Sequence, residues 1–171
     1  DYRVTAQYVH SEAHNQLHFV NLGWQRADLQ EFVGVAPDGR VIYPNMNELE
    51  ESAPILLTNT DEGSADIFSI ALAKRYENGF SFDMSYTNTS AEDVSPYTSS
   101  RAISNFRGNL GPDRQADVAH TSTNEIEHAF NIFLSYERDF IGDLTTNVSL
   151  FGTIQSGRPF GYGMRSFRHL F

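Results

Sequence analysis

The sequence predicts an all-β fold, in which about five antiparallel strands form part of an incomplete transmembrane β-barrel. Three observations lead to this prediction. Segments that alternate large apolar with small or polar residues recur along the chain, short turns join them in pairs, and long irregular connections separate the pairs. Strands of a membrane barrel alternate in this way because one face meets lipid and the other a watery lumen.

Residues 1–11 form the first predicted strand. Apolar and aromatic residues at even positions alternate there with mostly polar residues at odd positions, as in a strand whose two faces meet different surroundings. The pattern allows this strand to continue through residues 17–22. Residues 23–63 then lose the periodicity and contain turn-forming combinations such as Pro37 followed by Asp38 and Gly39. We predict a long loop over 23–63.

Two hairpins follow. In the first, residues 66–76 and 80–89 flank a short turn at 77–79. In the second, residues 125–138 and 144–155 flank a short turn at 139–143. Between the hairpins, residues 90–123 carry the proline, glycine, serine and asparagine clusters of a second long loop. The prediction for residues 1–171 is therefore a single partial β-barrel segment.

The two faces of these strands are expected to meet different solvents. The predicted lipid-facing residues are Phe68, Ile70, Leu72, Phe82, Met84, Phe130, Ile132, Leu134, Val148 and Leu150. The predicted lumen-facing residues are Ser69, Asp83, Ser85, Asn131, Ser135, Asn147 and Ser149. Both assignments follow from the period of two along each strand.

Loop length alternates long, short, long, short along the chain. Outer-membrane barrels have short periplasmic turns and long extracellular loops, whereas soluble sandwiches usually have long and short loops at both ends. The asymmetry favours the barrel. The alternative that stays open is a soluble secreted β-sandwich that binds a glycan or a protein ligand, with the same apolar rows packed together as a core.

Aromatic residues flank both short turns, Tyr76 and Phe80 at the first and Tyr136 and Phe140 at the second. Aromatic rings gather at the interfaces of a membrane barrel, where amphipathic rings lie at headgroup level. Ordinary hairpin ends also carry aromatic residues, so the rings support the barrel without deciding between the two solvents.

Composition and charge exclude several classes of function. The formal net charge of -10 disfavours a nucleic-acid partner, because a phosphate backbone is bound through clustered lysine and arginine. The absence of cysteine removes disulfides, thiolate metal sites and cysteine nucleophiles. No run approaches the roughly 20 apolar residues of a transmembrane helix. A mean hydropathy of -0.41 does not argue against barrel strands, in which every second residue is polar.

No catalytic, cofactor-binding or metal-ligating residue is predicted. His10, His14 and His18 recur every four residues, but in a strand this spacing separates them by roughly 13 Å per step, too far to share an ion. A local helix over residues 11–16 would place them on one face and stays an alternative, although the flanking alternation favours an extended chain. Glu125 and His128 form a single Glu-x-x-His, whereas di-iron bundles need two copies on facing helices. The chain also lacks a Gly-x-Ser-x-Gly motif and a glycine-rich phosphate loop. We therefore expect a protein that is not an enzyme.

Acidic residues are concentrated in the first long loop. Residues 61–66 have the acid density of a loose calcium site without the ligand order of an EF-hand, so weak calcium affinity stays an alternative. Acidic residues recur between Ala27 and Asp66, whereas the only basic residue in that stretch is Arg40. Either this is a solvated surface, or the loop meets cationic or metal-bearing ligands, or divalent ions that bridge lipopolysaccharide.

Several stretches of the chain carry a resemblance to a known family. The most distinctive is Ser-Gly-Arg-Pro-Phe-Gly-Tyr at 156–162, and the others are residues 97–100, 104–106, 127–128, 134–136 and 146–151. These stretches resemble the C-terminal barrel portion of TonB-dependent outer-membrane receptors of the Oar type. Asp-Gly-Arg-Val-Ile-Tyr at 38–43 is similar to a loop of the same proteins.

This resemblance implies a transporter of about 22 strands with a plug domain inside the lumen, powered through the periplasm by TonB. Five strands cannot close such a barrel, so the chain is expected to be a fragment. Its implied partners are outer-membrane lipid and lipopolysaccharide, the rest of the barrel and the plug domain, and TonB through regions outside this chain. The implied location is the outer membrane of a Gram-negative bacterium. The implied function is the binding and uptake of an external ligand, with specificity in loops 23–63 and 90–123.

Overall fold

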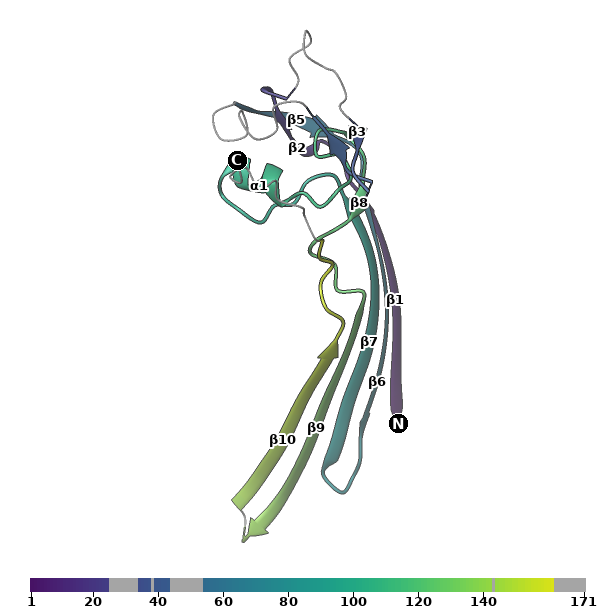
Figure 1. The fold of residues 1–171 in the computed structure, drawn as a ribbon. Coiled ribbons are helices and arrows are strands. Elements are labelled where there is room, and N and C mark those ends of the chain that lie inside the picture. The colour runs from purple at the N-terminus through teal and green to yellow at the C-terminus, as the bar shows by residue number, and fades with distance from the viewer. Residues whose placement is uncertain (25–33, 38, 44–53, 143, 162–171) are drawn as a thin grey trace.

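In the computed structural model, the chain forms one long antiparallel sheet with a smaller folded region at one end of it (Figure 1). The structure describes residues 1–24, 34–37, 39–43, 54–142 and 144–161. The all-β, antiparallel class is confirmed: strands dominate these residues, beside one short helix, α1 (Ala102–Gly108). The sheet is not closed into a barrel.

Five long strands form the main sheet in the order β1-β6-β7-β9-β10. They are β1 (Tyr2–Glu12), β6 (Ser64–Arg75), β7 (Phe80–Asp93), β9 (His128–Ile141) and β10 (Leu144–Gln155). A two-residue strand, β8 (His120–Thr121), pairs with the end of β7. The long strands extend over 11 to 14 residues, because none contains a proline and β-branched and aromatic residues alternate along them.

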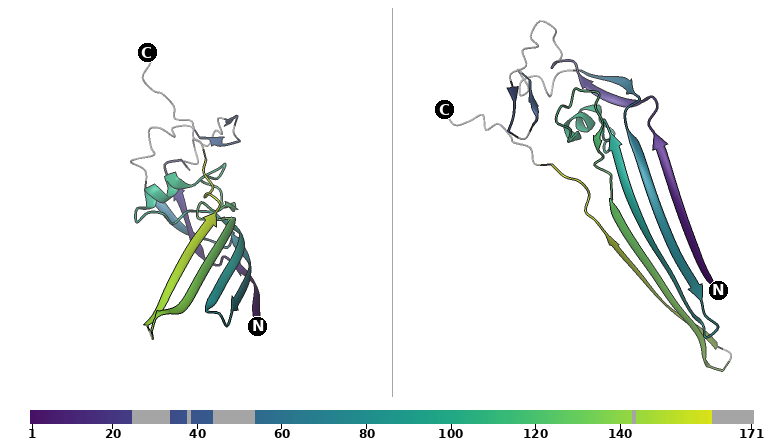
Figure 2. Two further views of the ribbon diagram at one scale, coloured as in Figure 1. Left: turned by 90° about the horizontal axis from the view of Figure 1, so that it is seen from below. Right: turned by 90° about the vertical axis from the view of Figure 1, so that its right-hand side faces the viewer.

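Both short turns lie at the same end of the main sheet (Figures 1 and 2). In the first, Tyr76 N donates to Phe80 O at 2.8 Å and Gly79 has a φ of 87°. In the second, β9 continues to Ile141 and β10 begins at Leu144, so the strands occupy most of the turn predicted at 139–143.

Gly79 is expected to be more sensitive to substitution than Gly142, although both have a positive φ. A Cβ at Gly79 would overlap the carbonyl oxygen of Glu137 on β9, whereas a Cβ at Gly142 would meet open space. We expect Gly142→Ala to cost about 1 kcal/mol of unfolding free energy, from backbone strain alone. Gly79→Ala should cost measurably more, because the turn must also move away from β9. Urea titration of both variants tests this, and equal losses would contradict it.

The first strand does not continue through residues 17–22, although the alternation in the sequence allows it. The chain leaves β1 at Glu12, turns at Asn15, whose φ is 54°, and enters β2 (Gln16–Asn21). Strand β2 pairs with β5 (Ile55–Thr60) in a separate two-stranded sheet. Asparagine adopts the left-handed conformation more easily than most residues, so the chain turns here without the glycine or proline that would have marked the turn.

Much of the sequence predicted as long loops is folded into a cap at the other end of the main sheet (Figure 1). We define the cap as the described residues of 13–63 and 94–127. It contains β2, β5, α1, β8 and the short pair β3 (Gly34–Val35) and β4 (Val41–Ile42). Its hydrophobic core consists of Phe19, Trp24 and Phe106, with Tyr43, Ile55, Ala102 and Ile103 packed against it.

Candidate membrane interface and cap

The strand register places the apolar rows of all five long strands side by side. In one rung, Val4 lies opposite Leu72, Leu72 opposite Met84, Met84 opposite Ile132, and Ile132 opposite Gly152. The rungs on either side are paired in the same way. We call the shared surface the apolar face; its residues are Val4, Ala6, Tyr8, Phe68, Ile70, Leu72, Phe82, Met84, Tyr86, Phe130, Ile132, Leu134, Val148, Leu150 and Ile154.

Nothing in the described part of the chain covers the apolar face. Val4, Leu150 and Ile154 are 65%, 63% and 74% exposed. The main-sheet strands contact one another and β8, while β2, β5 and α1 pack together in the cap. The soluble sandwich would need a second sheet over this face, and the described residues supply none. A contiguous exposed apolar surface of this kind marks contact with a membrane or with another protein.

The opposite face of the main sheet is mainly polar. Thr153 Oγ1 donates to Asn131 Oδ1 at 2.9 Å, and Arg3 Nη2 lies 3.6 Å from Asp83 Oδ2. Phe133 and Phe151 lie opposite each other as an apolar exception on this face. All the residues predicted to face the lumen share it.

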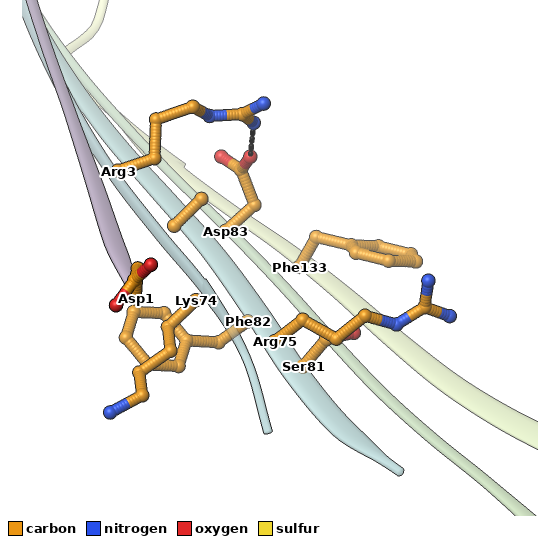
Figure 3. Close-up of a pocket in the computed structure, with 9 residues that line it drawn as sticks. Asp1, Arg3, Lys74, Arg75, Ser81, Phe82, Asp83 and Phe133 are labelled. Carbon is orange, nitrogen blue, oxygen red and sulfur yellow. Dashed lines mark ion pairs between the residues drawn. The ribbon is translucent and has the colours of Figure 1, made fainter. Parts of the chain in front are cut away.

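A hollow of about 460 Å³ lies near the short turns (Figure 3). Its lining includes Arg3, Arg75, Asp83 and Phe133 from the polar face. Arg3 and Asp83 point toward one another across it. Both are well exposed, so their ion pair contributes less than about 1 kcal/mol. Of these residues, only Asp83 was predicted from the sequence, as a lumen-facing residue; the signal for Arg3 and Arg75 is positive charge at odd positions near the strand ends.

Aromatic side chains border the apolar face at the short-turn end, and we call this border the short-turn rim. Tyr76 and Phe80 have ring centroids 5.8 Å apart, and Tyr136 and Phe140 have ring centroids 6.4 Å apart. Residues 130–140 of β9 reach from one border of the face to the other. At about 3.4 Å per residue and a tilt of about 45°, they span about 24 Å, close to the apolar band of a membrane barrel.

The border at the cap end is polar. Asp66 Oδ1 accepts a hydrogen bond from Tyr8 Oη at 2.5 Å and lies 2.8 Å from His10 Nδ1. On the same face, between β7 and β9, Tyr86 Oη lies 3.0 Å from His128 Nδ1. The rings of Tyr8 and Tyr86 thus belong to the apolar face, while their hydroxyls contact polar side chains at its border. Amphipathic rings at a membrane interface lie in the same way.

The two parts of the cap, 13–63 and 94–127, are joined by hydrogen bonds that involve side chains. Asn21 N donates to Gln115 Oε1, and Gln115 Nε2 donates back to Asn21 O, both at 2.8 Å. Tyr97 Oη donates to Leu17 O at 2.8 Å. Tyr43 Oη lies 2.9 and 2.8 Å from the two carboxylate oxygens of Asp113. Burial and this carboxylate raise the pKa of Tyr43, so its hydroxyl stays a hydrogen-bond donor.

His18 lies inside the cap and is only 3% exposed. Burial lowers the pKa of its imidazole below the usual 6.5, although Asp117 Oδ1 lies 3.9 Å from Nδ1 and acts in the opposite direction. The unfolded chain therefore takes up a proton as the pH falls below about 6.5, before the folded cap does. The cap is expected to be more stable above this pH and to lose stability as the pH falls through this window.

Urea titrations at pH 7.5 and 5.5, followed by the fluorescence of Trp24, measure this loss. His18→Gln should remove part of the pH dependence. His14→Gln is the matched control, because the side chain of His14 is 73% exposed and its replacement should leave the pH dependence unchanged. Identical pH dependence in wild type and His18→Gln would contradict the assignment.

The histidines that recur every four residues do not come together. His10 lies beside Asp66 in the main sheet, His14 lies in the connection after β1, and His18 is buried in the cap. No group of three or more His, Cys, Asp or Glu in the described residues is arranged to hold a metal ion.

The acidic residues Asp61 and Glu125 also make separate contacts. Asp61 accepts a hydrogen bond from Asn15 N at 2.8 Å, and Glu125 accepts one from Ala91 N at 2.5 Å. Most of the acids predicted to meet cations or bridging ions lie outside the described residues: Asp28, Glu31, Asp38, Glu48, Glu50 and Glu51.

The distinctive motif at 156–162 begins where β10 ends. Ser156 N donates to His128 O at 2.8 Å, and Ser156 Oγ accepts from His128 N at 3.0 Å. The serine thus fastens the end of β10 to the start of β9. The final tyrosine of the motif, at position 162, lies outside the described residues.

Comparison with protein-family models, with curated proteins and with solved structures found no match for this chain. Membership of the receptor family therefore stays a prediction that rests on the sequence motifs. In the described residues, no helix is both long enough and apolar enough to cross a membrane.

Proposed function

We propose that this chain is part of the wall of a transmembrane β-barrel in the outer membrane of a Gram-negative bacterium. The main observation in support is the apolar face, which is continuous over five strands and bordered by aromatic rings at one end and a polar row at the other. In this proposal the short turns lie on the periplasmic side and the cap on the outside.

The size of the hydrophobic term supports lipid as the solvent of this face. Removing one large aliphatic or aromatic side chain from water contributes about 1.5–3 kcal/mol. The apolar face carries more than ten such side chains, which the sheet leaves only partly exposed, so its exposure to water would cost on the order of 10 kcal/mol. This is as large as the net stability of a typical domain, about 5–15 kcal/mol.

The unpaired edges of the main sheet also support a place in a barrel wall. Among the described residues, β1 pairs only with β6, and β10 only with β9. Unpaired backbone groups at a sheet edge are not tolerated in lipid. The proposal therefore requires further strands of a barrel beside β1 and beside β10.

We further propose that the complete barrel is a TonB-dependent receptor that binds an external ligand and takes it up. The resemblance of the sequence to such receptors supports this, as does a folded cap built from both long connections. Binding residues are concentrated on connections that a rigid scaffold holds in place, and the cap fits this description.

Quenching by brominated lipid tests the membrane wall. Ile70→Trp and Ile132→Trp are made in a full-length protein whose other tryptophans are replaced by phenylalanine, and Asn131→Trp is the control on the polar face. We expect strong quenching at 70 and 132 and weak quenching at 131. Absence of quenching at 70 and 132 would favour the soluble sandwich.

Cross-linking to TonB tests the uptake function separately. The full-length protein in outer membranes is expected to cross-link to TonB, and more strongly when ligand is bound. A protein that inserts into the outer membrane but never cross-links would keep the barrel and remove TonB-dependent uptake.

A further inference from the structure

We propose that the short-turn rim binds the phosphate group of phospholipids in the adjacent leaflet, through Lys74 and Arg138. This inference rests on the proposed function, because it needs the apolar face to meet lipid. It adds a specific lipid contact that an aromatic border alone does not provide.

Lys74 is the only lysine of the chain. It lies on the same side of the main sheet as the apolar face, opposite Tyr2 on β1 and Phe82 on β7. Its Nζ is 3.9 Å from the centroid of the Tyr2 ring and 4.3 Å from that of Tyr76. These cation–π contacts hold the ammonium group at the level of the aromatic rings.

Arg138 extends the same rim on β9. Its Nη1 donates to Tyr136 Oη at 3.3 Å, and Tyr136 also packs edge to face against Phe140. Arg138 is exposed, and its guanidinium carries further N–H donors besides the one that Tyr136 accepts. Lys74 and Arg138 are therefore both presented among aromatic rings on the side of the sheet that would meet lipid.

Neither cation forms an ion pair with a carboxylate in the described residues. On the opposite face, by contrast, Arg3 is paired with Asp83. At the cap end, by contrast, the border of the apolar face contains an acid, Asp66, whose Oδ1 lies 2.8 Å from His10 Nδ1. Among the described residues, the short-turn rim is thus the border of the apolar face at which positive charge lies without an ion-paired acid.

Charge and depth together favour a phospholipid phosphate as the partner. Aromatic rims lie at the level of the headgroups. A lipid phosphate at that depth supplies a negative charge that can pair with the two cations. Arginine can hold a phosphate through two parallel hydrogen bonds, and lysine binds it as a point charge. An anionic phospholipid adds net charge at the same depth, so it should bind more tightly than a neutral lipid.

Native mass spectrometry of the full-length protein, extracted in detergent and titrated with phosphatidylglycerol, measures this contact. Lys74→Met and Arg138→Gln should each weaken phosphatidylglycerol binding about fivefold, and the double variant more than tenfold. Arg75→Gln is the matched control, because Arg75 is next to Lys74 but belongs to the opposite face, and it should leave binding unchanged. Lys74→Arg should retain most of the affinity and shows that the charge, not the fold, is responsible.

Three outcomes would overturn the inference. Lys74→Met and Arg75→Gln could weaken binding equally, diacylglycerol could bind as tightly as phosphatidylglycerol, or inorganic phosphate could displace the lipid completely, which would indicate a site for the free anion. The proposed function fails in a different way: the wild-type protein would then not insert into lipid vesicles at all. Normal insertion with unchanged lipid binding in both variants removes this inference alone.

Discussion

Ile132→Arg is expected to destabilise the protein in lipid by about 2–4 kcal/mol, the cost of an arginine on a lipid face near the middle of a membrane. Ile132 lies in the central rung of the apolar face, between Met84 and Gly152. Its methyl group would be 3.1 Å from a Cβ at Gly152, so Ile132 packs over that glycine. An arginine there loses this packing and places a charge in hydrocarbon.

Asn131→Arg is the matched control, because Asn131 is the preceding residue on the same strand and belongs to the polar face. It should cost only about 1 kcal/mol, from loss of the hydrogen bond that Thr153 donates to Asn131. The free energies of unfolding are measured by urea titration of the full-length protein in lipid vesicles. Equal costs for the two variants would mean that the two faces meet the same solvent.

Phe106→Ala is expected to lower the stability of the cap by about 3–5 kcal/mol, the range measured for removal of a buried phenylalanine. Phe106 is 1% exposed, and its ring packs edge to face on Trp24 with centroids 4.9 Å apart. Trp24 also stacks on Tyr43 at 5.5 Å. Because this core joins helix α1 to β2 and to the segment after β4, its loss should open the whole cap.

The effect should be confined to the cap. Hydrogen exchange followed by mass spectrometry is expected to show faster exchange in β2, β5 and α1, with the amides of β6 and β7 still protected. Val118→Ala is the matched control, since Val118 belongs to the cap and is 61% exposed, and it should change exchange very little. Equal loss of protection in β6 and β7 would contradict a cap with a core of its own.

The main sheet could be predicted from the sequence because each of its strands repeats one simple pattern. In the pairs Ile70 with Tyr86 and Leu134 with Leu150, residues of the same parity lie opposite each other, so alternation along single strands became one continuous face across the sheet. The period of two and the short turns suffice for the hairpins β6–β7 and β9–β10, whereas the pairings of β1 with β6 and of β7 with β9 cross long connections.

The cap could not be predicted in the same way. Its turn at Asn15 has no glycine or proline, and its core brings Phe19 and Trp24 onto Phe106, which lies far away in the sequence, so the core residues form no period. Their contacts depend on how two long connections meet, which is decided by pairs such as Asn21 with Gln115. Single polar contacts between distant residues leave no pattern in a sequence.

The lipid exposure of β9 tests the central claim most directly. The chain has no cysteine, so single cysteines can be placed in turn at each position from 129 to 135 and labelled with a nitroxide in the full-length protein in vesicles, after any other cysteines have been replaced. We predict that collisions with oxygen, which concentrates in lipid, dominate at 130, 132 and 134, and that a water-soluble nickel complex reaches 129, 131, 133 and 135. Access of the nickel complex to both rows, or to neither, would contradict a wall that separates lipid from water.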